Sequence, residues 1–213
     1  MTPDLPKVLP RGRHAAPRHV VEASQRTRLL EAMAAVVAQR GYAATAVADV
    51  IRAAGVSRKT FYEHFTNKED CFLQAYELGV QLLLEAIEAA QAEHAHDPLS
   101  AADAGVRAYL ATLASRPEFA RTFLIEAHAA GPAVHERRAE VLLRFEEQLR
   151  RVSDEVRRRN PQLPAPPDHR YRAVVGANNE LVTEHVRVHG PAGVEALHER
   201  LLDVTLALLV GAP

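Results

Sequence analysis

The feature that most constrains the fold is the segment 45–68, which reads TAVADVIRAAGVSRKTFYEHFTNK. Its first half places apolar residues at the i, i+3, i+4 and i+7 positions of one helix face; they are Val47, Val50, Ile51 and Ala54. Thr45 is the predicted N-cap, because its hydroxyl can accept from the unpaired amides of the first turn. Gly55 is predicted to end this helix in a left-handed conformation. Two short helices joined by one glycine predict a helix-turn-helix.

The second helix of this motif has distinct inner and outer faces. Ser57 is its predicted N-cap. Phe61 and Phe65 lie four residues apart and share a face, so they are expected to pack onto the first helix. Lys59 and Glu63 then point nearly opposite to Phe61. The outer face of this helix is therefore predicted to be polar.

A helix with such an outer face fits the major groove of DNA. Lys59 is the predicted contact to a guanine edge, whereas Thr60 and Tyr62 suit phosphate or sugar. Two roles are open for Glu63: its carboxylate can accept a hydrogen bond from a cytosine amino group, or it can form a solvated ion pair with Lys59. His64 lies near the inner face, so packing competes with a phosphate contact.

Residues 53–70, AAGVSRKTFYEHFTNKED, resemble the signature of the tetracycline-repressor (TetR) family of transcriptional regulators. The residues that fall at the family's spacings are Gly55, Val56, Ser57, Thr60, Phe61, Tyr62, His64, Phe65, Lys68 and Glu69. Ile51 departs from the family, which usually carries a small alanine there, and this predicts a slightly different angle between the two helices. The resemblance also implies that Lys68 touches the DNA backbone. The expected DNA-binding residues are Thr45, Ser57, Arg58, Lys59, Thr60, Tyr62, His64 and Lys68.

The resemblance implies a ligand-responsive repressor. Such a protein binds a palindromic operator in double-stranded DNA as a homodimer and is released by a small-molecule effector. It also implies that the last two helices form a four-helix dimer interface, and that the larger domain holds an apolar pocket. Apolar stripes in the last predicted helix agree with a homodimer, because one face can serve the subunit's own core and another a partner; the two stripes are Val194, Leu197, Leu201, Val204 and Leu208, and Leu202, Leu206, Leu209 and Val210.

Charge and composition divide the chain into parts. Residues 1–70 carry a net charge of +4 and the remainder a net charge of −5, which favours a DNA-binding module joined to a different domain. We expect a flexible basic arm over 1–21, a helix-turn-helix domain over 22–68 and an effector-binding and dimerisation domain over 69–213. The arm is rich in proline and arginine, and it suits either a minor-groove contact or a solubilising tail.

The whole chain is predicted to be all-α. A helix over 24–40 with Leu29, Met33, Val36 and Val37 on one side precedes the motif, and Asn67 is a predicted N-cap for the helix that follows it. Prolines and a Gly-Pro pair then punctuate a series of apolar repeats without a strand pattern. The expected helices span 68–95, 99–115, 117–129, 132–159, 168–189 and 192–210. A three-helix DNA-binding domain followed by a helical bundle is the result.

Effector-binding candidates are polar or aromatic side chains on apolar helix faces. Asn178 follows Val174 by four residues and precedes Leu181 by three, so it is expected to face inward and to need a hydrogen-bond partner. Glu126 follows Phe123 by three and is expected to share its face. The candidate set is Tyr109, Phe119, Phe123, Glu126, His128 and Asn178. Ordinary core or interface packing is the alternative interpretation for each of them.

No cofactor or metal is expected, and a redox-sensing role of the single cysteine stays open. His185 and His189 are spaced i, i+4 with Glu184 beside them, which can hold a metal, but the sequence offers no third well-placed ligand. The single cysteine, Cys71, cannot form an internal disulfide and is predicted to be buried. With no secretory or membrane-spanning segment visible, a cytoplasmic location is expected.

An enzyme is the competing class. The sequence contains no GxSxG elbow, no GxxxxGK[ST] phosphate loop and no GxGxxG fingerprint, so no enzymatic activity is expected. Two alternatives stay open: a helical small-molecule-binding protein or enzyme with a vestigial DNA-binding domain, and an architectural DNA-associated protein that uses the same motif. Protection of one short palindrome in footprinting separates a regulator from these alternatives.

Overall fold

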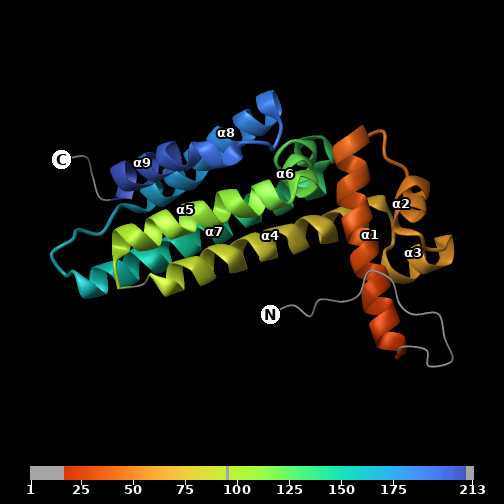
Figure 1. The fold of residues 1–213 in the computed structure, drawn as a ribbon, viewed down its shortest axis with the longest axis horizontal. Helices are drawn as coiled ribbons and strands as arrows, with labels where there is room; N and C mark the ends of the chain where they lie inside the picture. Colours follow the sequence, from red (N-terminus) through yellow and green to blue (C-terminus); the bar gives the residue numbers. More distant parts are fainter. Residues whose placement is uncertain (1–16, 95, 210–213) are drawn as a thin grey trace.

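The fold is all-helical in a computed structural model that describes residues 17–94 and 96–209 (Figure 1). Within these residues the regular elements are α1 (Arg18–Arg40), α2 (Val47–Ala54), α3 (Arg58–His64), α4 (Lys68–Glu93), α5 (Pro98–Ser115), α6 (Pro117–Leu124), the 3-10 helix η1 (Glu126–Ala129), α7 (Pro132–Arg159), α8 (Asp168–His189), the 3-10 helix η2 (Val194–Leu197) and α9 (His198–Leu209). This architecture confirms the predicted fold class. None of the described helices is both long enough and apolar enough to cross a membrane.

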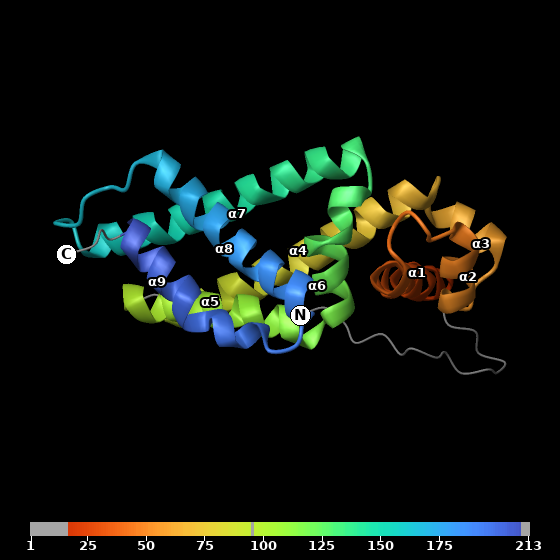
Figure 2. The ribbon, with the colours of Figure 1, turned by 90° about the horizontal axis from the view of Figure 1, so that it is seen from above.

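Helices α1, α2 and α3 lie together at one end of the molecule, and the remaining helices form an elongated bundle (Figures 1 and 2). The long helix α4 begins beside α3 and runs into the bundle, where it packs along α5 and against α7. Helix α6 lies against α1, while α8 and α9 pack against each other on the bundle. The connection between the two parts is therefore formed by α4 and α6.

The core of the small part follows the sequence pattern. Leu29, Met33 and Val37 of α1 are fully buried and Val36 is 8% exposed, which confirms the predicted inward side of this helix. Leu29, Met33 and Val37 meet buried residues of α2 and α3 in one cluster, which continues into the first turns of α4. Because the same cluster includes residues of η1 and α7, the small part is packed onto the bundle.

Three predicted helix ends agree with the structure. The Ser57 hydroxyl accepts from the amide of Thr60 at 3.0 Å, and the Asn67 side chain accepts from the amide of Asp70 at 2.9 Å. Both predicted caps are confirmed. Gly55 ends α2 with φ 62° and ψ 40°, a left-handed conformation that costs a residue with a Cβ atom.

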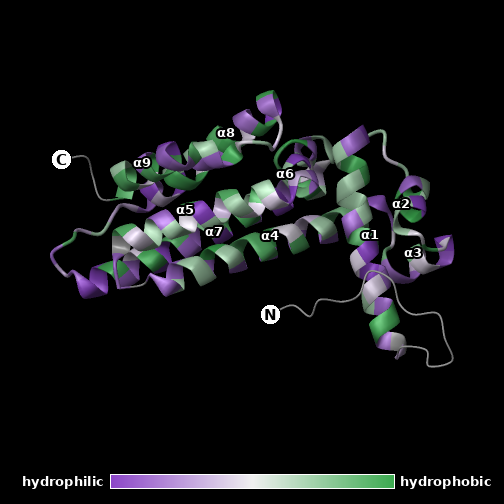
Figure 3. Cartoon of the chain, in the orientation of Figure 1, coloured by the Kyte–Doolittle hydropathy of each residue, from purple (hydrophilic) through white to green (hydrophobic). Residues whose placement is uncertain are grey.

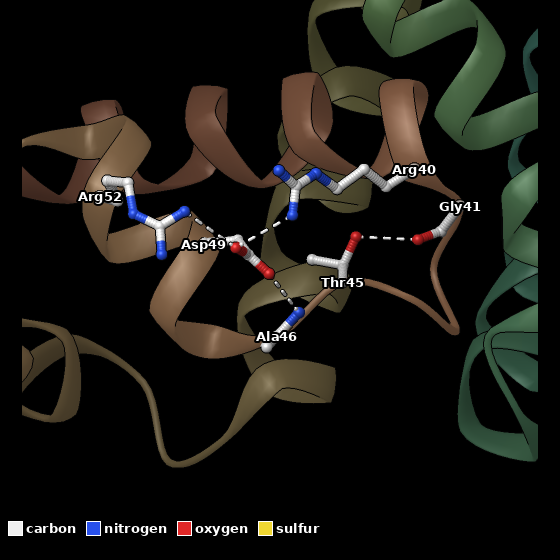
Figure 4. A network of polar contacts seen from close by, with 6 residues as sticks. All are labelled: Arg40, Gly41, Thr45, Ala46, Asp49 and Arg52. Carbon is white, nitrogen blue, oxygen red and sulfur yellow. Dashed lines mark hydrogen bonds and ion pairs between the residues drawn. The ribbon is translucent and has the colours of Figure 1, made fainter.

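The prediction that Thr45 caps α2 is wrong (Figure 4). The helix starts one residue later, and the Thr45 hydroxyl donates to the carbonyl of Gly41 at 2.8 Å. The amide of Ala46 donates instead to Asp49 Oδ2 at 3.1 Å. Asp49 in turn contacts Arg40 and Arg52 at 3.1 and 3.2 Å. A carboxylate in the first turn is a stronger acceptor than a hydroxyl and also complements the helix dipole.

Several predicted boundaries need correction. Helix α1 begins at Arg18, so residues 18–21 are helical and do not belong to the arm predicted over 1–21. Residues 1–16 of that arm lie outside the described residues. The helix predicted over 117–129 is interrupted at Ile125, and the one predicted over 192–210 is divided into η2 and α9. In both places the chain tightens into a 3-10 turn, which the apolar spacing alone does not distinguish from an α-helix.

Candidate nucleic-acid interface and ligand cavity

Helix α3 presents a polar outer face above a buried aromatic face. Phe61 and Phe65 are 0% and 2% exposed, as predicted for the inner side. The Lys59 and Glu63 side chains are 86% and 55% exposed, and Lys59 Nζ lies 3.8 Å from Glu63 Oε1. They thus form the solvated pair that the sequence allowed. Since such an exposed pair contributes little to stability, Lys59 is free to exchange this partner for another.

The first turn of α3 is fixed by side-chain hydrogen bonds. The hydroxyl oxygens of Ser57 and Thr60 lie 2.9 Å apart. Tyr62 is 47% exposed, and the Arg58 guanidinium carbon lies 5.7 Å from the centre of its ring. This arrangement places two hydroxyl groups, a guanidinium and a phenol around the exposed start of a helix, where DNA phosphates are commonly bound.

Three further expected DNA contacts are also engaged within the protein. Lys68 Nζ donates to the carbonyls of Tyr42 and Thr45 at 2.9 and 3.0 Å and lies 4.1 Å from the centre of the Tyr42 ring. Thr45 is only 3% exposed. His64 is half-buried, with its ring centre 6.1 Å from that of Phe65. In this conformation the ammonium group of Lys68 holds the turn between α1 and α2.

A cavity of about 270 Å³ lies within the bundle, and most of its wall is apolar. Its lining on α4 extends from Tyr76 to Gln91, a length of about 22 Å at the helical rise per residue. Four of the six expected effector residues line it, namely Tyr109, Phe119, Phe123 and Asn178. The cavity therefore extends along the bundle beside α4.

Asn178 supplies a polar group to this cavity. Its Nδ2 donates to the Thr205 hydroxyl at 3.0 Å, and that hydroxyl donates to the carbonyl of Leu201 at 2.7 Å. The expected inward orientation and partner are thus present. The Asn178 Oδ1 atom is buried without a hydrogen-bond partner in the described part of the chain, so it can accept a hydrogen bond from a bound molecule.

The expectation that Glu126 and His128 line the cavity is wrong. Helix α6 ends at Leu124, so the i, i+3 relation between Phe123 and Glu126 does not place them on one face. Glu126 Oε2 instead accepts from the backbone amide of Tyr42 at 3.0 Å, at the junction between the two parts. The side chain of His128 is exposed. Both residues follow the turn that apolar spacing did not reveal.

Aromatic side chains connect the cavity wall with this junction. Phe119 and Phe123 have ring centres 5.1 Å apart, and Phe123 packs edge-on against Tyr76 at 5.0 Å. Phe72 lies 6.5 Å from Phe123 and 4.9 Å from Tyr42. The series runs without a break from side chains that line the cavity to the turn before α2.

Sequence reasoning missed the three charged residues in the wall, which are Arg116, Arg138 and Arg157. Helical spacing could have revealed Arg138 of α7, because it follows the buried Val134 by four residues and precedes the buried Val141 by three. Burial raises the pKa of Tyr76 to about 12 and also raises the pKa of Tyr109. The positive charge of Arg138 acts on both phenols in the opposite direction.

Neither the histidine pair nor the cysteine has the surroundings of a reactive site. The rings of His185 and His189 lie 5.2 Å apart, and His185 Nε2 is 3.0 Å from the carbonyl of Ala192. Among residues 17–94 and 96–209, no group of three potential metal ligands is assembled. Cys71 is fully buried, as predicted, and burial raises its pKa to about 12, which disfavours the reactive thiolate.

Comparisons with known proteins agree with this geometry. The family described as "Bacterial regulatory proteins, tetR family" matches residues 29–75. The HTH-type transcriptional regulator AcrR of Shigella flexneri is 33% identical over 85 residues, which span 39% of this chain and 40% of that protein. The match to this relative is therefore confined to less than half of its length.

Two solved structures share the fold along most of the chain. The fatty acid degradation regulator FadR from Bacillus halodurans superposes with a TM-score of 0.76 at 21% identity, covering 91% of this chain and 97% of its own. FadR from Bacillus subtilis, solved in complex with stearoyl-CoA, gives 0.73 at 19% identity, covering 88% and 99%. Together the motif and the fold define a helix-turn-helix protein with an appended helical domain. Within that class, residues 29–75 are similar to the tetR family of bacterial regulatory proteins.

Proposed function

We propose that this chain is a sequence-specific DNA-binding regulator whose helix α3 enters the major groove. The single observation that carries the proposal is the structure of α3 itself. Its exposed side holds Lys59 and Tyr62, whereas Phe61 and Phe65 anchor the opposite side in the core. The net charge of +4 on residues 1–70 supports the approach of this end to phosphates.

Selection of binding sites from fragments of the source genome, followed by footprinting, tests this proposal. A regulator protects one short palindrome, and its affinity for that site exceeds its affinity for random DNA by several orders of magnitude. Uniform, salt-sensitive coating of every fragment would instead support an architectural protein. Absence of DNA binding at low salt would contradict the proposal.

The dimer that a palindrome requires is proposed to form through α8 and α9. Both helices carry apolar residues along the outer part of the bundle (Figure 3). Val188 of α8 is 52% exposed, and Leu202, Val204 and Leu208 of α9 are only partly buried within one subunit. Two-fold pairing would cover these residues and place two α3 helices on the half-sites. Sedimentation velocity at micromolar concentration is expected to give a dimer, and a stable monomer would contradict this assignment.

The cavity is proposed to hold the effector, a long apolar molecule with a polar end. Its length of about 22 Å along α4 and its apolar wall suit a linear chain. FadR from Bacillus subtilis was solved with stearoyl-CoA, which supports an acyl compound as the first candidate. A ligand that binds the DNA-free conformation more tightly weakens DNA binding by the same factor, as linkage requires. The chain would then act as a repressor that is released by its ligand.

A further inference from the structure

Three arginines line the cavity, and among them Arg138 has an unusual environment. Arg116 is exposed, and Arg157 is paired with a carboxylate. Arg138 lies on α7 and is half-buried, and it lines the same cavity as Tyr76 of α4 and Tyr109 of α5. The surrounding wall is mainly apolar. An arginine usually avoids such a position unless a carboxylate or phosphate accompanies it, because removal of its charge from water is unfavourable.

No such partner accompanies Arg138 within residues 17–94 and 96–209, where it makes neither a hydrogen bond nor an ion pair. Its neighbours on the same helix are engaged. Arg137 lies 3.8 Å from Glu77 and 3.3 Å from Glu140, and Arg144 donates to Glu77. The carboxylate of Glu77, which like Arg138 acts on Tyr76, is therefore already shared by two other arginines.

Arg138 and two tyrosines of the cavity wall together supply a set of hydrogen-bond donors. Guanidinium groups bind carboxylates and phosphates through two parallel N–H bonds. The pKa of Tyr76 is raised to about 12 by burial, and that of Tyr109 is raised in the same way, so both hydroxyl groups keep their protons at neutral pH and can donate. A positive charge and two phenols in one apolar wall are suited to an anion.

We propose that Arg138, assisted by Tyr76 and Tyr109, binds the anionic group of an amphipathic ligand. The apolar chain of that ligand would extend along α4 toward Gln91, at the other end of the cavity lining. The inference rests on the proposed function in one respect, which is that the cavity is the effector site. A carboxylate and a phosphate share the required chemistry, and the experiment below distinguishes them.

Displacement of Nile red, a neutral probe, tests the assignment with three ligands. Palmitate carries a carboxylate, palmitoyl-CoA carries phosphates, and cetyl alcohol has a similar chain without charge. The variant is Arg138→Gln, and the matched control is Arg137→Gln, which removes the neighbouring charge outside the cavity lining. Circular dichroism at increasing temperature establishes that both variants are folded.

We expect Arg138→Gln to weaken binding of an anionic ligand by about tenfold or more and to change the affinity for cetyl alcohol by less than about twofold. Arg137→Gln is expected to change neither affinity. Selective loss for palmitate identifies the carboxylate, and selective loss for palmitoyl-CoA identifies the phosphate. An equal loss for all three ligands, no loss for any, or failure of the wild type to bind them would overturn the assignment. DNA binding by the same samples separately decides the proposed regulatory function.

Discussion

At the scale of single residues, α3 divides its roles between inner and outer positions. Lys59 is 86% exposed and makes only a weak ion pair, so its removal is not expected to affect folding. The buried Phe61, by contrast, is part of the core. Substitutions on the outer face therefore report on DNA recognition with little interference from stability.

Lys59→Ala is expected to lower affinity for the selected operator by about 1–3 kcal/mol and to relax base preference at one position of each half-site. Tyr62→Phe is expected to weaken binding to all sequences to a similar extent, because the phenol is assigned to the backbone. Fluorescence anisotropy with a panel of single-base operator variants measures both effects. The control is Arg151→Ala on α7, which removes an exposed charge in the bundle; if it weakened binding equally, a general charge effect would explain the data.

Lys68 is expected to act mainly within the protein. Its ammonium group donates to two backbone carbonyls and lies over the Tyr42 ring, and hydrogen bonds from charged groups contribute about 1.5–3 kcal/mol. Lys68→Met should lower the free energy of unfolding by about this amount in urea titrations. It should leave the slope of log K against log salt unchanged. A smaller slope with unchanged stability would instead show that Lys68 contacts a phosphate.

The sequence specified those residues whose role depends on local spacing. Ser57, Asn67 and Gly55 were predictable because caps and left-handed turns follow from one residue and its helix. The structural role of Lys68 was less predictable, because its partners, the carbonyls of Tyr42 and Thr45, are 26 and 23 residues away in the chain. Its unfavourable place near the start of a helix was the signal that another interaction existed.

At the scale of elements, the start of α2 is held by one carboxylate. Asp49 accepts from the amide of Ala46, which is the main reason that its pKa is lowered, and Arg40 and Arg52 act in the same direction. A carboxyl group with a lowered pKa stabilises the fold above its ordinary value of 3.8, and this contribution is lost as the pH falls through the folded-state pKa. Helix α2 is therefore expected to be sensitive to acid.

Asp49→Asn is expected to reduce stability at neutral pH and to reduce the dependence of stability on pH below about pH 4, where the wild-type carboxylate becomes protonated. Urea denaturation at several pH values measures both. Asp154→Asn, which removes the partner of Arg157 on α7, serves as the control for loss of one carboxylate. Identical pH profiles for the wild type and Asp49→Asn would contradict the role of Asp49.

The contact between α4 and α6 depends on a glycine in the helix. A Cβ atom at Gly79 would lie 2.2 Å from Cε2 of Phe123 and 2.9 Å from Cδ1 of Phe119, and these rings are held by their aromatic neighbours. Gly79→Ala is expected to cost about 1–3 kcal/mol through overpacking and to weaken ligand binding by displacing Phe123. Thermal denaturation and the Nile red assay measure the two effects.

Gly105→Ala is the matched comparison, because it also lies on a helix beside the cavity. A Cβ atom there would meet the terminal amide of Gln91 at 2.6 Å. That flexible side chain can move, and alanine favours the helix by up to about 1 kcal/mol. Stability is therefore expected to change little. An equal loss in both variants would show that the rigidity of the Phe123 contact is not the cause.

At this scale, prediction failed where a helix ended without a strong sequence signal. The break after Leu124 turned Glu126 toward Tyr42 and left His128 exposed. Its consequence is structural coupling, because Glu126 joins η1 to the turn before α2. Thr122 adds a buried hydrogen bond from α6 to the carbonyl of Ala34 in α1 at 2.9 Å. Contacts between distant segments of this kind are not encoded in the spacing of either helix.

At the scale of the whole molecule, α3 lies at one end, and the helices that line the cavity form the adjoining bundle (Figure 1). The existence of a helical second domain was predictable from periodicity. The position of the cavity in this domain could not be predicted, because it depends on how α4, α5 and α7 face one another. The spacing that placed Asn178 on an inward helix face applies equally to Arg138, but the position of Arg138 in the cavity wall follows only from the assembled structure.

The proposed function requires energetic coupling between the cavity and α3. Operator affinity measured with and without saturating palmitoyl-CoA, and palmitoyl-CoA affinity measured with and without saturating operator, give this coupling directly. Each ligand is expected to weaken binding of the other by the same factor, in the range of about 5- to 150-fold that is usual for coupled sites. An operator affinity that does not change when the cavity is occupied would contradict this coupling.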